Sequence, residues 1–245
     1  MGIGLQHFFF KQFIPVVVPQ WPSRIPGHLV WILLVGAILF VAGALILTGK
    51  MARFAATMLG GLFLLTVALL HLPANIMGAG AAHIGSWTAA FKALAFSGSC
   101  LVVAGTLPEA TEDSARRSFS IIGSLEKLIP LGMYPLAIMV IVFGADHFLY
   151  VPFVSSLVPA WIPWHVFWTY FAGTALIAAG VGMIFRVKAR LAATLLGAMI
   201  FAWVIVLHIP RAVADPYGLI GNEWTSVFEA LAFSGIAFIL GRTLP

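Results

Sequence analysis

The chain has 245 residues, of which 62% are hydrophobic and only 9% are charged. Because soluble globular domains carry roughly 25% charged residues, this composition excludes a water-soluble domain and predicts an integral membrane protein. The formal net charge of +5 does not indicate a nucleic-acid partner, since the few basic residues are scattered between apolar runs. The single cysteine, Cys100, excludes an intrachain disulfide and a CxxC motif.

A membrane-spanning helix needs about 20 mostly apolar residues, and seven stretches of the chain meet this requirement. They are residues 28–48, 52–72, 87–105, 128–147, 165–185, 189–209 and 224–241. The first 18 residues are also apolar, but Lys11 and Pro15 interrupt them. We therefore expect only a short partial or interfacial helix at this end.

The distribution of lysine and arginine predicts the orientation of these spans. Most basic residues fall in the turns 49–53 and 186–190, in the loop 106–127 and at the C-terminus, all on one side. The opposite side holds only Lys11, Arg24 and Arg211. Because cytoplasmic loops are enriched in basic residues, we expect the C-terminus in the cytoplasm and the N-terminus outside.

The polar stretch at 108–118 is the one linker-like segment and mixes charges of both signs. It predicts a first repeat at 1–107, a cytoplasmic polar linker at 108–127 and a second repeat at 128–245.

The two halves of the chain resemble each other at a separation of 137 positions. Gly43 corresponds to Gly180, Arg53 to Arg190, His71 to His208 and Trp87 to Trp224, and FKALAFSG at 91–98 corresponds to FEALAFSG at 228–235. No gap is needed across three helices, which indicates an internal duplication.

The match continues upstream at a separation of 140 positions. Gly4, His7 and Phe8 correspond to Gly144, His147 and Phe148. The repeated unit therefore has four helices, with Gly-x-x-His-Phe closing the first. We expect an all-α, polytopic membrane bundle of seven transmembrane helices, formed by two parallel four-helix repeats. The first repeat lacks its first helix, which has been lost or precedes Met1 in a longer product.

Six of the seven histidines form repeat-matched pairs near the predicted outer ends of the helices. They are His7 with His147, His28 with His165, and His71 with His208. Neutral imidazole can bind haem iron or a divalent metal, and it can donate a hydrogen bond to a quinone carbonyl. These six residues are therefore candidate ligand or proton-transfer sites. The structural alternative is that they sit at the membrane interface or interact with helix C-termini.

Lys92 and Glu229 occupy the one position that differs between FKALAFSG and FEALAFSG. Both lie five residues inside an interfacial tryptophan, roughly 7–8 Å below the predicted outer surface. Because charges inside a membrane usually find partners, we expect the two side chains to pair; the alternative is that Lys92 snorkels outward. The small residues spaced four apart in each phrase, Ala93 with Ser97 and Ala230 with Ser234, predict a face for close helix packing.

Asp146 is a secondary candidate, because its carboxylate could tune the neighbouring His147. Adjacent residues on a helix do not face each other, and the first repeat has Gln6 at the corresponding position.

The segment GADHFLYVPFVSSLVPAWIPWHVFWTYFAG at 144–173, with KARLAATLLG at 188–197, resembles the DoxX-like family of bacterial membrane proteins. LLHLPANIM at 69–77 is similar to the end of the third helix of that family. The resemblance covers both repeats and implies four-helix bundles in the bacterial inner membrane. It also implies an accessory role in redox pathways, some of them coupled to quinones, beside other membrane redox subunits.

These observations leave three functions open. The first is a redox-associated membrane subunit with a quinone, haem or metal site near the outer face. The second is a small-molecule carrier with parallel repeats, although the end of helix 128–147 matches the first repeat and so does not act as a simple linker. The third is a structural or assembly protein without a ligand. No catalytic residue or cofactor is assigned, and whether the chain is an enzyme stays open.

Overall fold

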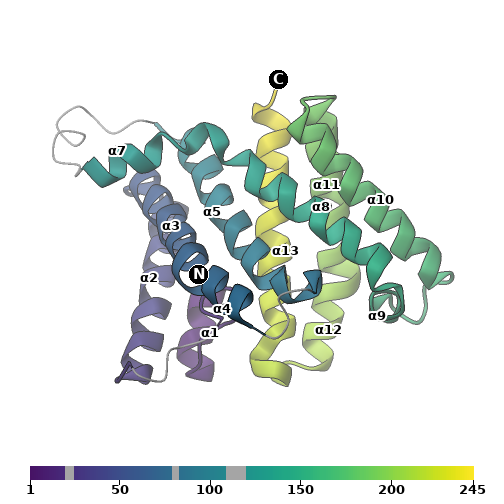
Figure 1. The fold of residues 1–245 in the computed structure, drawn as a ribbon, viewed down its shortest axis with the longest axis horizontal. Coiled ribbons are helices and arrows are strands. Elements are labelled where there is room, and N and C mark those ends of the chain that lie inside the picture. The colour runs from purple at the N-terminus through teal and green to yellow at the C-terminus, as the bar shows by residue number, and fades with distance from the viewer. Residues whose placement is uncertain (20–24, 79–82, 109–119) are drawn as a thin grey trace. The chain divides into compact units, whose positions relative to one another are not determined.

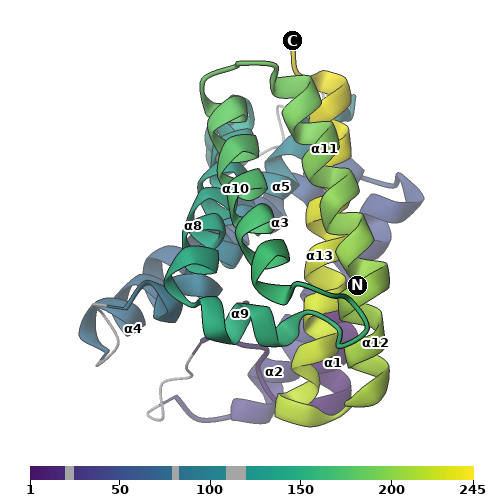
Figure 2. The same cartoon turned by 90° about the vertical axis from the view of Figure 1, so that its right-hand side faces the viewer.

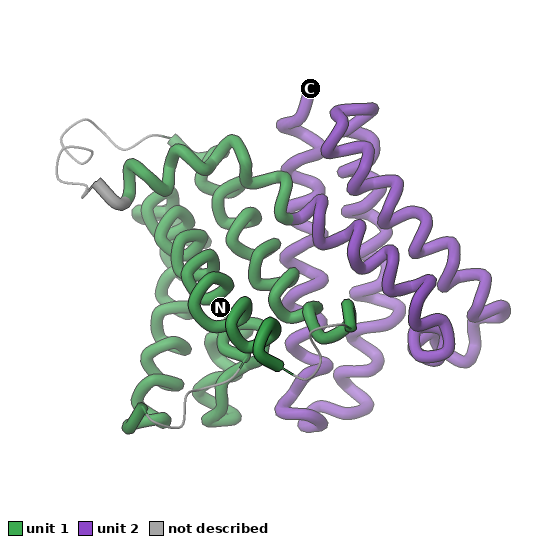
Figure 3. The backbone as a smooth tube through the Cα atoms, viewed as in Figure 1, with its two compact units in different colours: residues 1–135 green, residues 136–245 purple. Residues whose placement is uncertain are grey.

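A computed structural model describes residues 1–19, 25–78, 83–108 and 120–245, and these residues form helices and connecting segments without β-strands. The chain forms two compact units, Met1–Pro135 and Leu136–Pro245 (Figure 3). The boundary between them falls inside helix α8 (Met133–Leu149). Each unit is described by itself below.

Within the described ranges, six helices are long and apolar enough to cross a membrane, and a bent pair provides a seventh crossing if it is counted as one span. The six are His28–Thr48, Ala52–Met77, Ile84–Thr106, His165–Ile184, Ala189–Ala214 and Gly218–Thr243. The bent pair joins Ile122–Leu131 to Met133–Leu149 at an angle of 52°. The predicted all-α, polytopic membrane architecture is therefore confirmed.

The first unit begins with the short helix α1, which packs against the first long helix, α2 (Figure 1). Helix α3 packs against both α2 and α5, and the short α7 also contacts α3. The elements are α1 (Gly2–Phe10), α2 (His28–Thr48), α3 (Ala52–Thr66), η1 (Val67–His71), α4 (Leu72–Met77), η2 (Ile84–Trp87), α5 (Thr88–Thr106), α7 (Ser120–Glu126) and η3 (Ile129–Leu131).

The second unit contains most of α8, followed by a short helix, α9, that runs across the end of α10 rather than along it (Figure 2). Helix α11 packs against both α10 and α13. The elements after α8 are α9 (Val151–Leu157), α10 (His165–Ile184), α11 (Ala189–Trp203), η4 (Val204–His208), α12 (Ile209–Ala214) and α13 (Gly218–Thr243). The backbone at residues 219–221 is left-handed, so the regular part of α13 begins after Gly221.

Each unit has one π-helical turn, at Val67–His71 and at Val204–His208. In both cases a proline follows the histidine by two residues, Pro73 in the first unit and Pro210 in the second. Proline has no N–H and its ring clashes with the carbonyl four residues earlier, so the regular α-helical pattern cannot pass through it. The wider π turn accommodates this disruption within a continuous span.

The predicted linker at 108–127 lies partly outside the described residues, which exclude 109–119. Its last part is the helix α7, where Glu126 accepts a hydrogen bond of 2.8 Å from Nε of Arg53. Arg53 also donates to the carbonyl oxygens of Ala104 and Leu107, at 3.3 and 2.9 Å. This arginine, at the start of α3, is therefore bonded to the ends of both α5 and α7.

The small-residue faces predicted in FKALAFSG and FEALAFSG are confirmed as packing surfaces. The hydroxyl of Ser97 donates to the carbonyl oxygen of Gly60 at 2.8 Å, and the hydroxyl of Ser234 donates to that of Gly197 at 2.9 Å. Both serines are buried. Each bond joins the last long helix of a unit to the helix before it, α5 to α3 and α13 to α11.

Candidate functional site at the histidine ends of the helices

His7, near the end of α1, uses both ring nitrogens in contacts with the backbone. Nδ1 lies 2.8 Å from the carbonyl oxygen of Ile3, which can only accept, so Nδ1 carries the proton. Nε2 then accepts a hydrogen bond of 3.4 Å from the backbone N–H of Ile14. The ring is fully buried, and it has no nitrogen left for a ligand.

Two other histidines of the first unit, His28 and His71, contact the segment that contains Ile14, residues 13–17. Nε2 of His71 lies 3.2 Å from the carbonyl oxygen of Val16, to which it donates. His28 packs edge-on against the ring of Phe13, with the ring centroids 5.3 Å apart. The three histidines therefore surround a short buried stretch of chain. Each of them has a contact with this segment, and the contacts found for them do not form a ligand set.

His147 occupies the corresponding position at the end of α8 in the second unit. Its Nδ1 donates to the carbonyl oxygen of Phe143 at 2.7 Å, as His7 does to Ile3. Nε2 has no hydrogen-bond partner among the described residues. In the neutral ring this nitrogen is an acceptor. Donation from Nε2 to a quinone carbonyl would therefore require the protonated ring.

Two neighbours complete the surroundings of His147. The ring of Trp203 stacks on the imidazole, with centroids 6.3 Å apart and an interplanar angle of 21°. The corresponding residue of the first unit is the small, buried Thr66. Oδ1 of Asp146 is buried and has no hydrogen-bond partner in the described part of the chain. This end of α8 thus has two acceptor groups, on adjacent residues whose side chains point in different directions, and one aromatic face beside His147.

The close approach of α8 to α10 places His147, and it depends on glycine. A Cβ atom added at Gly173 would lie 2.8 Å from the Cβ of His147, which is too short for any larger residue without movement. The first unit has the same arrangement, since a Cβ at Gly36 would lie 2.9 Å from that of His7. In each unit, a glycine on the neighbouring helix therefore leaves room for the Cβ atom of the histidine.

A bidentate ion pair, not expected from the sequence, joins α12 to α13. Nε and Nη2 of Arg211 donate to the two carboxylate oxygens of Glu223, at 3.0 and 2.8 Å. His208 ends the π turn that precedes α12. The sequence signal was two opposite charges twelve residues apart at the same end of a helical hairpin. The described contacts of His165 involve its backbone carbonyl, which accepts from Thr169.

Lys92 and Glu229 belong to different units, so their pairing stays a prediction. Glu229 is only 4% exposed and Lys92 is half-buried. Within the described residues, no group of three His, Cys, Asp or Glu side chains is arranged to hold a metal ion.

Together, the helical spans and the histidine ends define a polytopic α-helical membrane protein. Comparison of the chain with family models, with curated proteins and with solved structures found no match.

Proposed function

We propose that the chain is a DoxX-like membrane protein of two duplicated four-helix repeats, acting as an accessory subunit of a redox pathway, with a quinol site at His147. Corresponding contacts in the two units support the duplication. The hydrogen bond between Ser97 and Gly60 recurs 137 positions later between Ser234 and Gly197. The hydrogen bond between His7 and Ile3 recurs 140 positions later between His147 and Phe143. These separations are the ones that relate the two halves of the sequence.

The observation that carries the quinol site is the unused acceptor nitrogen of His147. A quinol head group has two hydroxyl donors on an aromatic ring. One hydroxyl can donate to Nε2 of His147, and Asp146 offers a second acceptor, the buried Oδ1. Trp203 presents an aromatic face beside the imidazole, on which a flat ring could also pack. Two acceptors suit the reduced quinol better than the quinone, whose carbonyl oxygens only accept.

Haem is the other ligand that this geometry suits. Histidines that bind metals usually donate their second ring nitrogen to a carbonyl or carboxylate, as Nδ1 of His147 does to Phe143. A haem-bound preparation would absorb visible light, whereas a quinol-bound one would not. An optical spectrum of the purified protein therefore separates the two.

The experiment that tests the site is a titration of the protein in nanodiscs with a short-tailed quinol, followed by calorimetry. We expect saturable binding that is weakened about tenfold in His147→Phe, the loss of one hydrogen bond to a buried group. His165→Phe, on the next helix of the same unit, is the matched control and should bind as the unaltered protein does. Equal binding by the protein and His147→Phe, or no binding at all, would refute the quinol site.

A second candidate is a structural or assembly protein without a ligand. It is favoured by the first unit, where His7 and His71 bond to the backbone of residues 13–17 and so hold a segment in place. In that case, replacing His147, His165 and His208 together would leave function intact.

The carrier is less well supported. Helix α8 contacts α10 through Gly144 and Gly173, as α1 contacts α2 through Gly4 and Gly36. This correspondence favours α8 as a member of a repeat over a linker between two three-helix units.

A further inference from the structure

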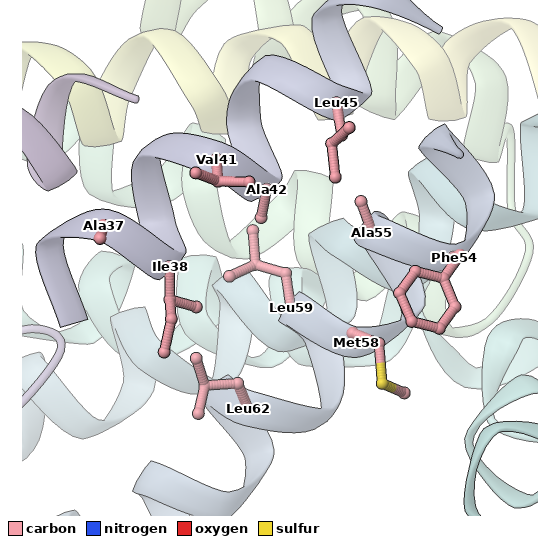
Figure 4. Close-up of a pocket in the computed structure, with 10 residues that line it drawn as sticks. All are labelled: Ala37, Ile38, Val41, Ala42, Leu45, Phe54, Ala55, Met58, Leu59 and Leu62. Carbon is pink, nitrogen blue, oxygen red and sulfur yellow. The ribbon is translucent and has the colours of Figure 1, made fainter. Parts of the chain in front are cut away.

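A shallow groove runs between α2 and α3 in the first unit, with a volume of about 500 Å³ (Figure 4). Its lining consists of aliphatic side chains, Phe54 and Met58, so only carbon and sulfur atoms of side chains face it. Val41 and Ile38 are 54% and 41% exposed. Because α2 and α3 belong to spans apolar enough to cross a membrane, the groove lies at the level of the lipid hydrocarbon.

The groove has a local cause in the sequence. Leu45 and Ala55 face it from the two helices. The corresponding residues of the second unit are Gly182 and Ala192, and a Cβ added at Gly182 would lie 3.2 Å from the Cβ of Ala192. Helices α10 and α11 therefore approach closely at this level. In the first unit the larger Leu45 occupies the position that corresponds to Gly182, and the groove lies beside it.

The turn beyond one end of the groove contains a lysine. Lys50 lies in the turn that connects α2 to α3, five residues beyond Leu45, and its side chain is exposed. Among the described residues it forms no ion pair, whereas its neighbour Arg53 is bound to Glu126 and to two carbonyl oxygens. From Ala37 to Lys50 the helix rises about 20 Å. This length accommodates an acyl chain of one leaflet, since the whole hydrocarbon core is about 30 Å thick.

We propose that this groove binds a phospholipid with an anionic head group, the acyl chain lying along α2 and α3 and the head group at Lys50. The predicted orientation places Lys50 on the cytoplasmic side, where anionic lipids concentrate. The site is separate from His147 and does not depend on the quinol proposal.

Two variants test the two parts of this site. Ala42→Phe fills the groove, and Lys50→Gln removes the charge at its end. The matched controls are Ala178→Phe, at an exposed position of α10, and Lys188→Gln, in the corresponding turn of the second unit. Leu62→Trp, at the far end of the groove, is a second filling variant in case Ala42→Phe does not fold.

The measurement is native mass spectrometry of protein released from nanodiscs that contain equal amounts of phosphatidylglycerol and phosphatidylcholine. We expect one retained phospholipid, with phosphatidylglycerol preferred about fivefold, the factor that one lysine contributes near an anionic surface. The filled variants should lose the retained lipid, and Lys50→Gln should keep it without the preference. Retention unchanged in both filled variants would overturn the proposal. If the unaltered protein is a dimer and these variants are monomers, a second copy is the occupant, and that result would also overturn the proposal.

Discussion

His7 and His147 show how the same residue can have different surroundings in the two units of one chain. Both donate from Nδ1 to the carbonyl oxygen four residues earlier, which fixes the same tautomer in each ring. The difference lies in what reaches Nε2. In the first unit the backbone of Ile14 does so, and in the second unit no described residue does. The two rings therefore differ in what lies beside Nε2.

Replacing His7 by alanine should mainly lower the free energy of unfolding and should have little effect on ligand binding. The backbone N–H of Ile14 would lose its acceptor in a buried position, at a cost of about 1–3 kcal/mol in the free energy of unfolding. Denaturant unfolding in detergent measures this change. His28→Ala, which removes a ring contact with Phe13, should cost less. A larger loss for His28→Ala would contradict this account of the two residues.

The sequence predicted which histidines are related but not what they contact. The separations of 137 and 140 positions are visible in the letters, whereas the approach of Ile14 to His7 depends on how residues 11–18 turn back. The position of Trp203 opposite His147 likewise follows from the packing of α8 against its neighbours. The Arg211–Glu223 pair could have been predicted, since opposite charges at one end of adjacent helices tend to meet.

At the scale of the helices, two pairs carry the same interhelical bond, α3 with α5 and α11 with α13. Each is formed by a serine hydroxyl and the carbonyl oxygen of a glycine that lets the backbones approach. The sequence ALAFSG, which the two halves share, thus contains the serine that forms this interhelical hydrogen bond in each unit.

Ser97→Ala and Ser234→Ala should each lower the free energy of unfolding by about 0.5–1.5 kcal/mol, the usual contribution of one hydrogen bond. Thermal unfolding of the two variants in the same detergent provides the comparison. Ser226→Ala, on a half-buried position of α13 whose hydroxyl bonds within its own helix, is the control. An effect in one unit and none in the other would count against equivalent packing.

The helical spans were predictable because membrane hydropathy is a strong signal, and the bounds of α2 agree with the predicted 28–48. The π turns were not predicted. Their signal, proline two residues after histidine, shows only that the helix is disturbed, and a break or a kink is as compatible with it. The spans also continue past these turns as α4 and α12, beyond the predicted ends at 72 and 209.

At the scale of the whole molecule, the arrangement of basic residues predicts one orientation in the membrane. A Cys100→Ala background permits single cysteines to be placed at Lys188 and at Trp161, which are both exposed. A membrane-impermeant maleimide added to intact cells should label Trp161→Cys and leave Lys188→Cys unlabelled until the membrane is opened. The reverse pattern would show that the positive-inside prediction is wrong.

The central claim is that the two corresponding histidines differ in whether Nε2 is available to a ligand. Nitrogen-15 NMR of histidine-labelled protein in nanodiscs measures this directly, with His7→Gln and His147→Gln used to assign the signals. When a short-tailed quinol is added, we predict that the Nε2 signal of His147 shifts while that of His7 stays constant. Equal shifts of both signals, or none in His147, would contradict the account.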